Sequence, residues 1–264
     1  MTSLTGEWAL VLGVSSGFGA SVARAMAAKG INVCGVHLDR RSTITSAVAT
    51  REACEAAGVR TLFFNVNATD AERRAEVLDA LAQVCPVGGL RLLFHSLAFG
   101  SLSPLVGTGP QESARQSQVA MTMDVMANSL VFWTQECVWR GLLGSQSRVL
   151  AMTSAGSTRA LPAYGIVSAA KAALEAYVRQ LALELGPRGI AVNALRAGVT
   201  DTPALRKIPG HEAMMDAARR ANPGGRLTLP QDVAGVVSFL VEPQARWISG
   251  TVLAVDGGED VAAS

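Results

Sequence analysis

The chain has 264 residues, of which 49% are hydrophobic and 17% charged, a balance typical of a folded protein with a large buried core. Its net charge of +2 is too small to indicate nucleic acid or an anionic membrane surface as a partner. The four cysteines lack metal-ligand spacing, and no signal peptide or apolar run of transmembrane length is evident, so we expect no metal site, no membrane and a cytoplasmic location.

The first elements are a strand, a glycine-rich turn and a helix. The apolar run 8–12 predicts a buried parallel strand, and the Ala-rich segment 21–29 predicts a helix. The turn between them has the spacing G-x-x-x-G-x-G and ends at Gly19. Many such turns carry glycines, but here a helix N-terminus follows and offers N–H groups to a pyrophosphate. The residues expected around that pyrophosphate are Gly13, Ser15, Ser16, Gly17 and Phe18.

The end of the second strand, predicted over 31–36, is where such a unit selects its cofactor. An acidic side chain at this tip would bind the adenosine ribose and favour NADH. The tip here is His37, and Asp39 comes two residues later. Arg40 and Arg41 follow and can hold a 2′-phosphate through charge-assisted hydrogen bonds. We therefore expect NADPH rather than NADH; the alternative is that both arginines only cap a solvated loop.

The next two strands, expected over 60–66 and 90–94, alternate with helices over 43–57 and 71–84. Ligands collect beyond the carboxyl ends of parallel strands, where small and polar residues permit close contact. His95 is interpreted as structural rather than catalytic. The candidate cofactor contacts after these strands are Asn65, Val66, Ser96, Leu97 and Ala98.

The second half predicts one long helix over 118–143, then further alternating elements. These are strands over 148–152, 189–195 and 250–255, and helices over 164–185 and 232–241. Segment 197–229, rich in Pro and Gly with a helical stretch at 211–221, is interpreted as a mobile substrate lid. This order predicts a single α/β domain over 1–264, a Rossmann-type doubly wound parallel seven-stranded sheet with helices on both faces.

A serine, a tyrosine and a lysine follow the fifth strand. Tyr164 and Lys171 are seven residues apart, so on a helix they share one face about 10 Å apart along the axis. A nearby ammonium lowers the pKa of a phenol, which can then donate to a substrate oxygen that becomes negative. Ser154 would add a second hydrogen bond to that oxygen. The alternative is one surface tyrosine and one solvated lysine.

Together these motifs resemble the short-chain dehydrogenase/reductase family over essentially the whole chain. The matching residues are Gly13, Gly17, Gly19, Ser154, Tyr164, Lys171, Asn193, Gly198 and the terminal VDGG at 255–258. Most members place the tyrosine four residues before the lysine, where this chain has Val167. The Tyr-x6-Lys spacing resembles the NADPH-dependent enoyl-acyl-carrier-protein reductase branch.

Two further departures resemble the same branch. The run HSLAF at 95–99 stands where most members carry Asn-Asn-Ala-Gly. Met126 stands where most members carry an asparagine that completes a proton relay to water, although Asn128 offers a substitute nearby. Moving the tyrosine from position 167 to 164 shifts the phenol about 4.5 Å along the axis, toward the more distant oxygen of a conjugated thioester.

The resemblance implies hydride transfer from NADPH to an enoyl thioester carried by acyl carrier protein or coenzyme A. Tyr164 would donate to the enolate oxygen, Lys171 would hold the nicotinamide ribose and Ser154 would position the substrate. Contacts to the nicotinamide side would come from Gly198, Val199, Thr200 and Thr202. The family usually forms homotetramers that bury the helices predicted at 118–143 and 164–185. A carbonyl reductase or alcohol dehydrogenase on the same scaffold, and an NADP-binding protein without turnover, stay as alternatives.

Overall fold

A computed structural model describes residues 4–262, which form a seven-stranded sheet with all strands parallel. The strand order is β3-β2-β1-β4-β5-β6-β7, which confirms the predicted doubly wound α/β fold. The strands are β1 (Trp8–Leu12), β2 (Asn32–His37), β3 (Thr61–Asn65), β4 (Leu90–His95), β5 (Arg148–Thr153), β6 (Ala191–Ala197) and β7 (Val252–Val255).

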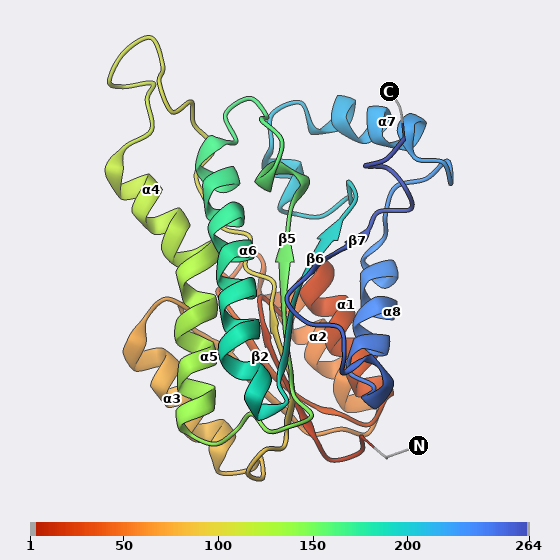
Figure 1. Ribbon diagram of the computed structural model, residues 1–264. Coiled ribbons are helices and arrows are strands. Elements are labelled where there is room, and N and C mark those ends of the chain that lie inside the picture. Colours follow the sequence, from red (N-terminus) through yellow and green to blue (C-terminus); the bar gives the residue numbers. More distant parts are fainter. Residues whose placement is uncertain (1–3, 263–264) are drawn as a thin grey trace.

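Helices cover both faces of the sheet, with α1, α2 and α8 on one face and α3, α5 and α6 on the other (Figure 1). Their bounds are α1 (Gly17–Ala28), α2 (Ile44–Ala56), α3 (Ala71–Ala82), α4 (Gln116–Met123), α5 (Ser129–Trp139), α6 (Gly165–Leu185), α7 (His211–Ala221) and α8 (Pro230–Leu240). The short helix α7 lies beyond the carboxyl ends of the strands, at the top of Figure 1. Among the described helices, none combines the length and the apolar character needed to cross a membrane.

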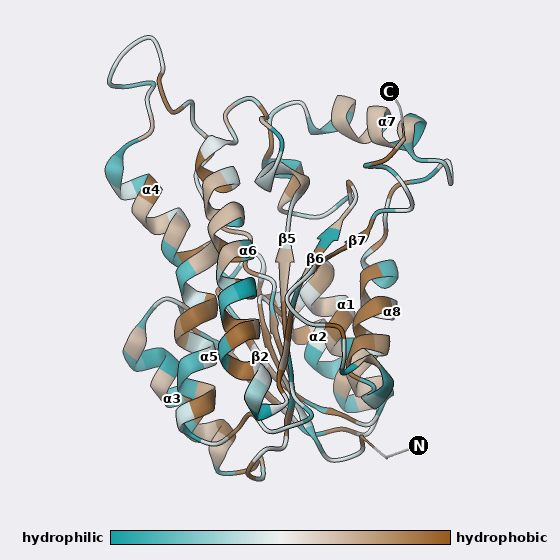
Figure 2. Cartoon of the chain, in the orientation of Figure 1, coloured by the Kyte–Doolittle hydropathy of each residue, from teal (hydrophilic) through white to brown (hydrophobic). Residues whose placement is uncertain are grey.

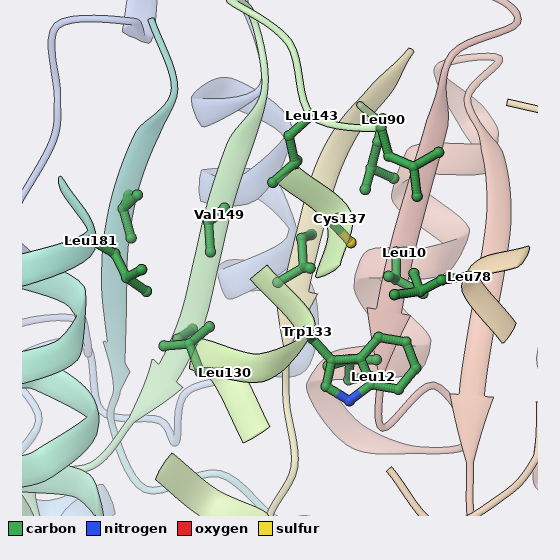
Figure 3. Close-up of a cluster of buried hydrophobic side chains, with 14 of the residues drawn as sticks. Leu10, Leu12, Leu78, Leu90, Leu130, Trp133, Cys137, Leu143, Val149 and Leu181 are labelled. Atoms are coloured by element: carbon green, nitrogen blue, oxygen red, sulfur yellow. The ribbon is translucent and has the colours of Figure 1, made fainter. Parts of the chain in front are cut away.

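Two apolar clusters hold the helices against the sheet, and the apolar segments in Figure 2 gather on the strands and the inner helix faces. On the α3, α5 and α6 face, the ring of Trp133 lies beside Leu12 and close to Leu10 and Leu78 (Figure 3). Its indole N–H is satisfied by the carbonyl of Ala68 at 2.8 Å, as a buried indole requires. This core fixes the strand ends from which the site is built.

The crevice between β1 and β4 is the topological switch point, because the chain winds outward from it in both directions. Gly13 follows β1 with a φ of 90°, a conformation that favours glycine. A Cβ on Gly13 would lie 2.5 Å from the carbonyl oxygen of Ser96, which follows β4. The first glycine of the motif therefore lets two adjacent strand ends approach each other closely.

The helix predicted over 118–143 is present as a run without a gap, but its middle has a different geometry and it ends earlier. The structure has α4, a π-helical turn at Asp124–Asn128 and α5, which ends at Trp139. Within the turn, the Asn128 amide donates to Asp124 at 2.8 Å, and the Ser129 hydroxyl donates to the Val125 carbonyl. A π-turn inserts one residue into the helix and re-aims the side chains that follow, which apolar periodicity alone does not show.

The helix after the glycine turn begins earlier than its Ala-rich segment predicts. Helix α1 starts at Gly17 rather than at Ser21, so the last two motif glycines belong to its first turn. The Ser16 side chain does not cap this helix, which leaves the first-turn amides available to a ligand. A Cβ on Gly19 would lie 2.0 Å from the Gly13 carbonyl oxygen, so this glycine is required for packing of the helix on the turn.

Candidate active site

A cavity of about 240 Å³ opens beyond the carboxyl ends of β4, β5 and β6. Eleven of the residues predicted from the sequence line it. They are Phe18, Ser96, Leu97, Ala98, Ser154, Tyr164, Lys171, Gly198, Val199, Thr200 and Thr202. The structure thus gathers the predicted Ser, Tyr and Lys, and all four predicted nicotinamide-side residues, around one space.

Tyr164 enters this cavity from the N-cap position of α6, one residue before the helix begins. Its ring packs on Gly156, where a Cβ would lie 2.6 Å from Tyr164 Cε1. Burial raises the pKa of the phenol, and the Ser154 hydroxyl beside it opposes that rise. The phenol is therefore a neutral hydrogen-bond donor near neutral pH, and its neighbouring donor is the predicted serine.

The backbone before Tyr164 is strained. Ala163 has a φ of 58° and is the only non-glycine residue with positive φ in the described chain. The left-handed region costs an alanine roughly 1 kcal/mol, and such strain persists where the surroundings impose it. The turn at Ala163 directs the chain into α6 and so places the phenol.

Lys171 lies two helical turns further along α6 and is buried, with 5% of its surface exposed. Its ammonium donates to the carbonyl oxygen of Met152 at 2.8 Å. Burial lowers the pKa of Lys171 to about 8, and Glu175 acts in the opposite direction. The expected lowering of the Tyr164 pKa by Lys171 does not occur in this state, because burial and Ser154 govern that phenol.

Strand β5 makes hydrogen bonds to Lys171 and to Glu175, which lies one turn further along the same face of α6. The Thr153 hydroxyl donates to Glu175 Oε1 at 2.6 Å. Glu175 is half-buried and lies one helical turn beyond Lys171. Neither Thr153 nor Glu175 stands out in the sequence, although an i, i+4 count from Lys171 would have found the carboxylate.

The cavity wall opposite the strand ends is apolar. Met126 is buried beside Tyr164 and Val167, so the two positions that depart from the common family pattern pack together. Asn128 does not line the cavity; its amide oxygen accepts from Tyr177 at 3.0 Å, and its nitrogen donates to Asp124. Asn128 therefore does not replace the relay asparagine. Further large apolar side chains that line the cavity are those of Leu102, Met152, Leu161, Leu205, Ile208 and Met214.

Segment 197–229 contributes Leu205, Ile208 and Met214 to that wall. The Lys207 ammonium lies over the exposed ring of Phe99, 5.8 Å from its centroid, which joins this segment to the loop after β4. Movement of the segment as a lid stays a prediction.

The C-terminal segment closes another side of the site. Sequence motifs do not indicate this, because the partners of the segment are distant along the chain. The Glu259 carboxylate lines the cavity and accepts from the Val199 amide at 3.1 Å. Burial raises the pKa of Glu259. Asp260 pairs with Arg159 at 2.5 Å and with Arg196 at 2.7 Å.

Gly13, Ser15, Ser16 and Gly17 do not line this cavity but form the adjoining β1–α1 turn. A Cβ on Gly17 would lie 3.4 Å from the Thr202 methyl carbon, so the turn and the segment after β6 lie against each other. The uncapped first turn of α1 beside this contact fits a dinucleotide, because it supplies backbone donors for a pyrophosphate next to the cavity that would hold the nicotinamide.

The predicted adenosine end lies at the tips of β2 and β3. His37 is buried, and its Nδ1 pairs with the Asp39 carboxylate at 2.9 Å. Asn65 holds the backbone of Asp39 through two hydrogen bonds of 2.8 and 2.9 Å. The Val66 amide donates to the His37 carbonyl at 2.8 Å, while the Arg40 and Arg41 side chains are exposed. These five predicted residues lie outside the cavity, at the same edge of the sheet.

His95 is buried under α5, and its Nε2 lies 2.8 Å from the Ser129 hydroxyl. Because that hydroxyl donates to the Val125 carbonyl, it accepts from the imidazole, which assigns the proton to Nε2. Burial lowers the pKa of His95 to about 3. His95 does not line the cavity, which agrees with its structural interpretation.

The family model described as enoyl-(acyl carrier protein) reductase matches residues 13–259. The 1-cyclohexenylcarbonyl-CoA reductase of Streptomyces collinus is 30% identical, over 96% of this chain and 87% of its own. The NADH-dependent enoyl-[acyl-carrier-protein] reductase of Nostoc sp. is 31% identical, over 99% of both chains.

Solved structures agree with these matches. A short-chain dehydrogenase from Burkholderia cenocepacia, determined in complex with NADP, is 30% identical to this chain. The two structures superimpose with a TM-score of 0.82, over 98% of this chain and 100% of the other.

Proposed function

Since the chain belongs to the short-chain dehydrogenase/reductase family and resembles its enoyl-reductase branch, we propose that it reduces an enoyl thioester with NADPH. The observation that carries this proposal is the pairing of Tyr164 with an apolar wall in one cavity. Such a wall accepts an acyl chain, and the phenol stands beside it as a neutral donor. The classes of two named relatives, an acyl-CoA reductase and an acyl-carrier-protein reductase, point the same way.

A bound NADPH would supply the hydride for the β-carbon of the substrate. Tyr164 would then donate a hydrogen bond to the thioester oxygen as negative charge develops on it, with the neighbouring Ser154 hydroxyl positioning the substrate. The protein stabilises this enolate most where water is excluded, and the apolar residues Met126 and Val167 beside the phenol exclude it.

Different residues around the strand ends would bind different parts of the cofactor. Lys171 would bind the nicotinamide ribose, exchanging part of its hydrogen bonding to Met152 for the ribose hydroxyls. The first turn of α1 would bind the pyrophosphate. Arg40 and Arg41 would bind the 2′-phosphate, because both are exposed while the nearby Asp39 carboxylate is already paired with His37.

The surroundings of Tyr164 favour an enoyl over a keto substrate. Reduction of a ketone requires rapid protonation of an alkoxide, for which a polar relay to water is useful. Here Met126 packs against the tyrosine, and the amide of Asn128 is held by Tyr177 and Asp124. An enolate needs stabilisation first and can take its proton afterwards, so it tolerates this apolar environment.

The proposal is tested by following NADPH oxidation with enoyl thioesters of increasing chain length, on coenzyme A and on acyl carrier protein. The same assay is run with 3-ketoacyl thioesters and simple ketones. We expect turnover of the enoyl thioesters only. Turnover confined to the keto substrates would replace the proposal with a carbonyl reductase, and tight NADPH binding without any turnover would replace it with a binding protein.

The role of the phenol is tested by Tyr164→Phe, with Tyr177→Phe as a matched control. Tyr177 is the other tyrosine of the chain, lies on the same helix and donates to Asn128 outside the cavity. Loss of one oxyanion donor costs roughly 10²- to 10³-fold in kcat. We expect that loss for Tyr164→Phe and less than a two-fold change for the control; equal kcat values in both variants would contradict the assignment.

We further propose a homotetramer that covers the outer faces of α5 and α6. Phe132, Trp139 and Leu183 lie on these helices and are 45%, 72% and 72% exposed, a large apolar surface for helices facing water. Light scattering that gives the mass of one chain would contradict this assembly.

A further inference from the structure

Three successive residues at the end of β5 contact α6 at three positions along one helix face. The Met152 carbonyl accepts from Lys171 at 2.8 Å, the Thr153 hydroxyl donates to Glu175 at 2.6 Å, and the Ser154 hydroxyl lies beside Tyr164. The first and last contacts involve the proposed catalytic residues. The middle contact, between Thr153 and Glu175, involves no residue with a role in the proposed reaction.

Lys171 needs a counter-charge. Its ammonium is buried, and among the described residues no carboxylate lies within ion-pair distance of it, since its hydrogen bond goes to a backbone carbonyl. Glu175 lies at position i+4 on the same face of α6, and its charge opposes the effect of burial on Lys171. Thr153 holds this carboxylate in place, because a hydroxyl bond of 2.6 Å is short and charge-assisted.

The other titratable groups around the cavity and on the elements packed against α6 are neutral, already paired or exposed to solvent. Arg179 and Arg188 are exposed, Glu136 pairs with Arg74 and Arg140, and Arg148 donates to backbone carbonyls. Tyr164 and His95 are neutral near neutral pH, since burial raises the pKa of the phenol and lowers that of the imidazole to about 3. The paired or bound groups are Asp124 with Asn128, Arg196 with Asp260, Glu259 with the Val199 amide, and Lys207 over Phe99.

We propose that Glu175, fixed by Thr153, is a positioning residue that keeps Lys171 protonated and so competent to hold the cofactor ribose. This inference rests on the proposed function. Glu175 is half-buried, touches neither the cavity nor a reacting atom, and acts only through Lys171. The pair Thr153 and Glu175 therefore links the end of β5, which Ser154 follows, to α6, which contains Lys171 and begins directly after Tyr164.

The test compares Glu175→Gln with Glu184→Gln, which removes an exposed carboxylate from the same helix, where it accepts from Gln180. The measurement is kcat/KM against pH with the best thioester substrate. In Glu175→Gln we expect the alkaline limb to move about one pH unit lower, so that activity well above its midpoint falls roughly ten-fold while activity near pH 6 is kept. The control should superimpose on the wild type.

Thr153 gives a second pair of variants. Thr153→Val removes the hydroxyl with little change of shape and should move the alkaline limb in the same direction, while Thr153→Ser keeps the hydroxyl and should restore the wild-type profile. A purely structural role would lower activity equally at all pH values. Unchanged alkaline limbs in Glu175→Gln and Thr153→Val would overturn the proposal.

The dissociation constant of NADPH, measured at several pH values, tests the role of Glu175 without requiring turnover. We expect NADPH binding to weaken at a lower pH in Glu175→Gln than in the wild type, with thermal melting used to confirm that both are folded. An identical pH dependence of binding overturns the role of Glu175. If the wild type binds NADPH but reduces no thioester, the proposed function fails while this binding experiment still decides the inference.

Discussion

The ammonium of Lys171 donates to the main-chain carbonyl of Met152 across a distance of 2.8 Å, inside a protein core where a charge is costly. The pKa of Lys171 is lowered to about 8 from an ordinary value of 10.5, and burial is the main cause. The helix α6 thus carries a charged group that opposes folding, and the proposed reaction supplies the reason for its presence.

Lys171→Met should therefore abolish turnover without destabilising the protein. Below pH 8 the substitution removes a buried charge whose cost is on the order of 1–3 kcal/mol, although it also removes the hydrogen bond to Met152. We expect a melting temperature equal to or above that of the wild type near pH 7. A large fall in melting temperature would show that the ammonium contributes to folding.

From the lowered pKa of Lys171 we expect activity and stability to change in opposite directions with pH. In the folded state Lys171 loses its proton near pH 8, whereas in the unfolded chain it does so near 10.5, so the unfolded state binds more protons between these values. The Lys171 contribution to stability therefore rises from pH 8 to 10.5, while cofactor binding by the ammonium declines. The free energies of unfolding of the wild type and Lys171→Met, measured with denaturant between pH 8 and 10.5, should differ least near pH 10.5.

The burial of His95 predicts how the free energy of unfolding changes at acid pH. Its pKa is lowered to about 3 from 6.5 because the ring is buried, so the folded state resists a proton that the unfolded chain accepts. Stability should fall as the pH drops from 6.5 toward 3. We expect His95→Gln, whose amide can still donate to Ser129, to be less stable at pH 7 but to lose less stability on acidification.

The comparison for His95 is the slope of unfolding free energy against pH between 6.5 and 4. His211, which lies in no strand and is only part-buried, supplies a control through His211→Gln. Identical slopes in the wild type and His95→Gln would contradict the neutral, buried state of this imidazole.

Much of the fold follows from the sequence, because a parallel sheet buried on both faces requires continuous apolar strands, and the order of strands and helices then permits few topologies. The predicted seven-stranded parallel sheet is confirmed. Residues grouped by a local motif, such as Ser154, Tyr164 and Lys171, were also located, since one strand and one helix position all three.

The features missed depend on geometry that local patterns do not carry. The π-turn at Asp124–Asn128 follows from packing and side-chain hydrogen bonds within a helix whose apolar residues look continuous. Glu259 and Asp260 follow a VDGG run that signals only a turn, and their partners lie up to 101 residues away. In a sequence, two acidic residues after such a turn indicate only a solvent-exposed segment.

Ala163 offers a test of strain at the site. Ala163→Gly should relieve the cost of its positive φ, about 1 kcal/mol, against a greater entropy cost of ordering glycine. We expect unchanged or slightly higher stability. Because the glycine loosens the turn that places Tyr164, we also expect a several-fold lower kcat with an unchanged dissociation constant for NADPH; a kcat equal to that of the wild type would show that the turn does not hold the phenol.

Cofactor selection is tested at Arg40 and Arg41, which we expect to bind the 2′-phosphate. The double change Arg40→Ala and Arg41→Ala should raise the KM for NADPH at least ten-fold, because charge-assisted hydrogen bonds to phosphate are lost, and should leave the KM for NADH within about two-fold. A matched control is Arg51→Ala, which removes an exposed arginine from the following helix, where it pairs with Glu55. Equal effects on both cofactors, or a wild type that prefers NADH, would reject this assignment.

Asp260 holds the C-terminal segment against the cavity through Arg159 and Arg196, and its neighbour Glu259 accepts from the Val199 amide. Asp260→Asn should weaken both ion pairs and loosen this wall. We expect the dissociation constant of NADPH to rise roughly ten-fold, about 1.4 kcal/mol, because the nicotinamide side of the site is then less ordered before binding.

The control for Asp260→Asn is Asp216→Asn, which breaks an exposed pair with Arg219 on α7. Exposed pairs contribute little, so this control should leave binding and melting temperature unchanged. The rise in the NADPH dissociation constant caused by Asp260→Asn should persist at high salt, since the Asp260 side chain is only 23% exposed and salt screens exposed ion pairs most. If Asp260→Asn binds NADPH as tightly as the wild type, the C-terminal segment does not form part of the cofactor site, and Glu259 then serves only to satisfy the Val199 amide.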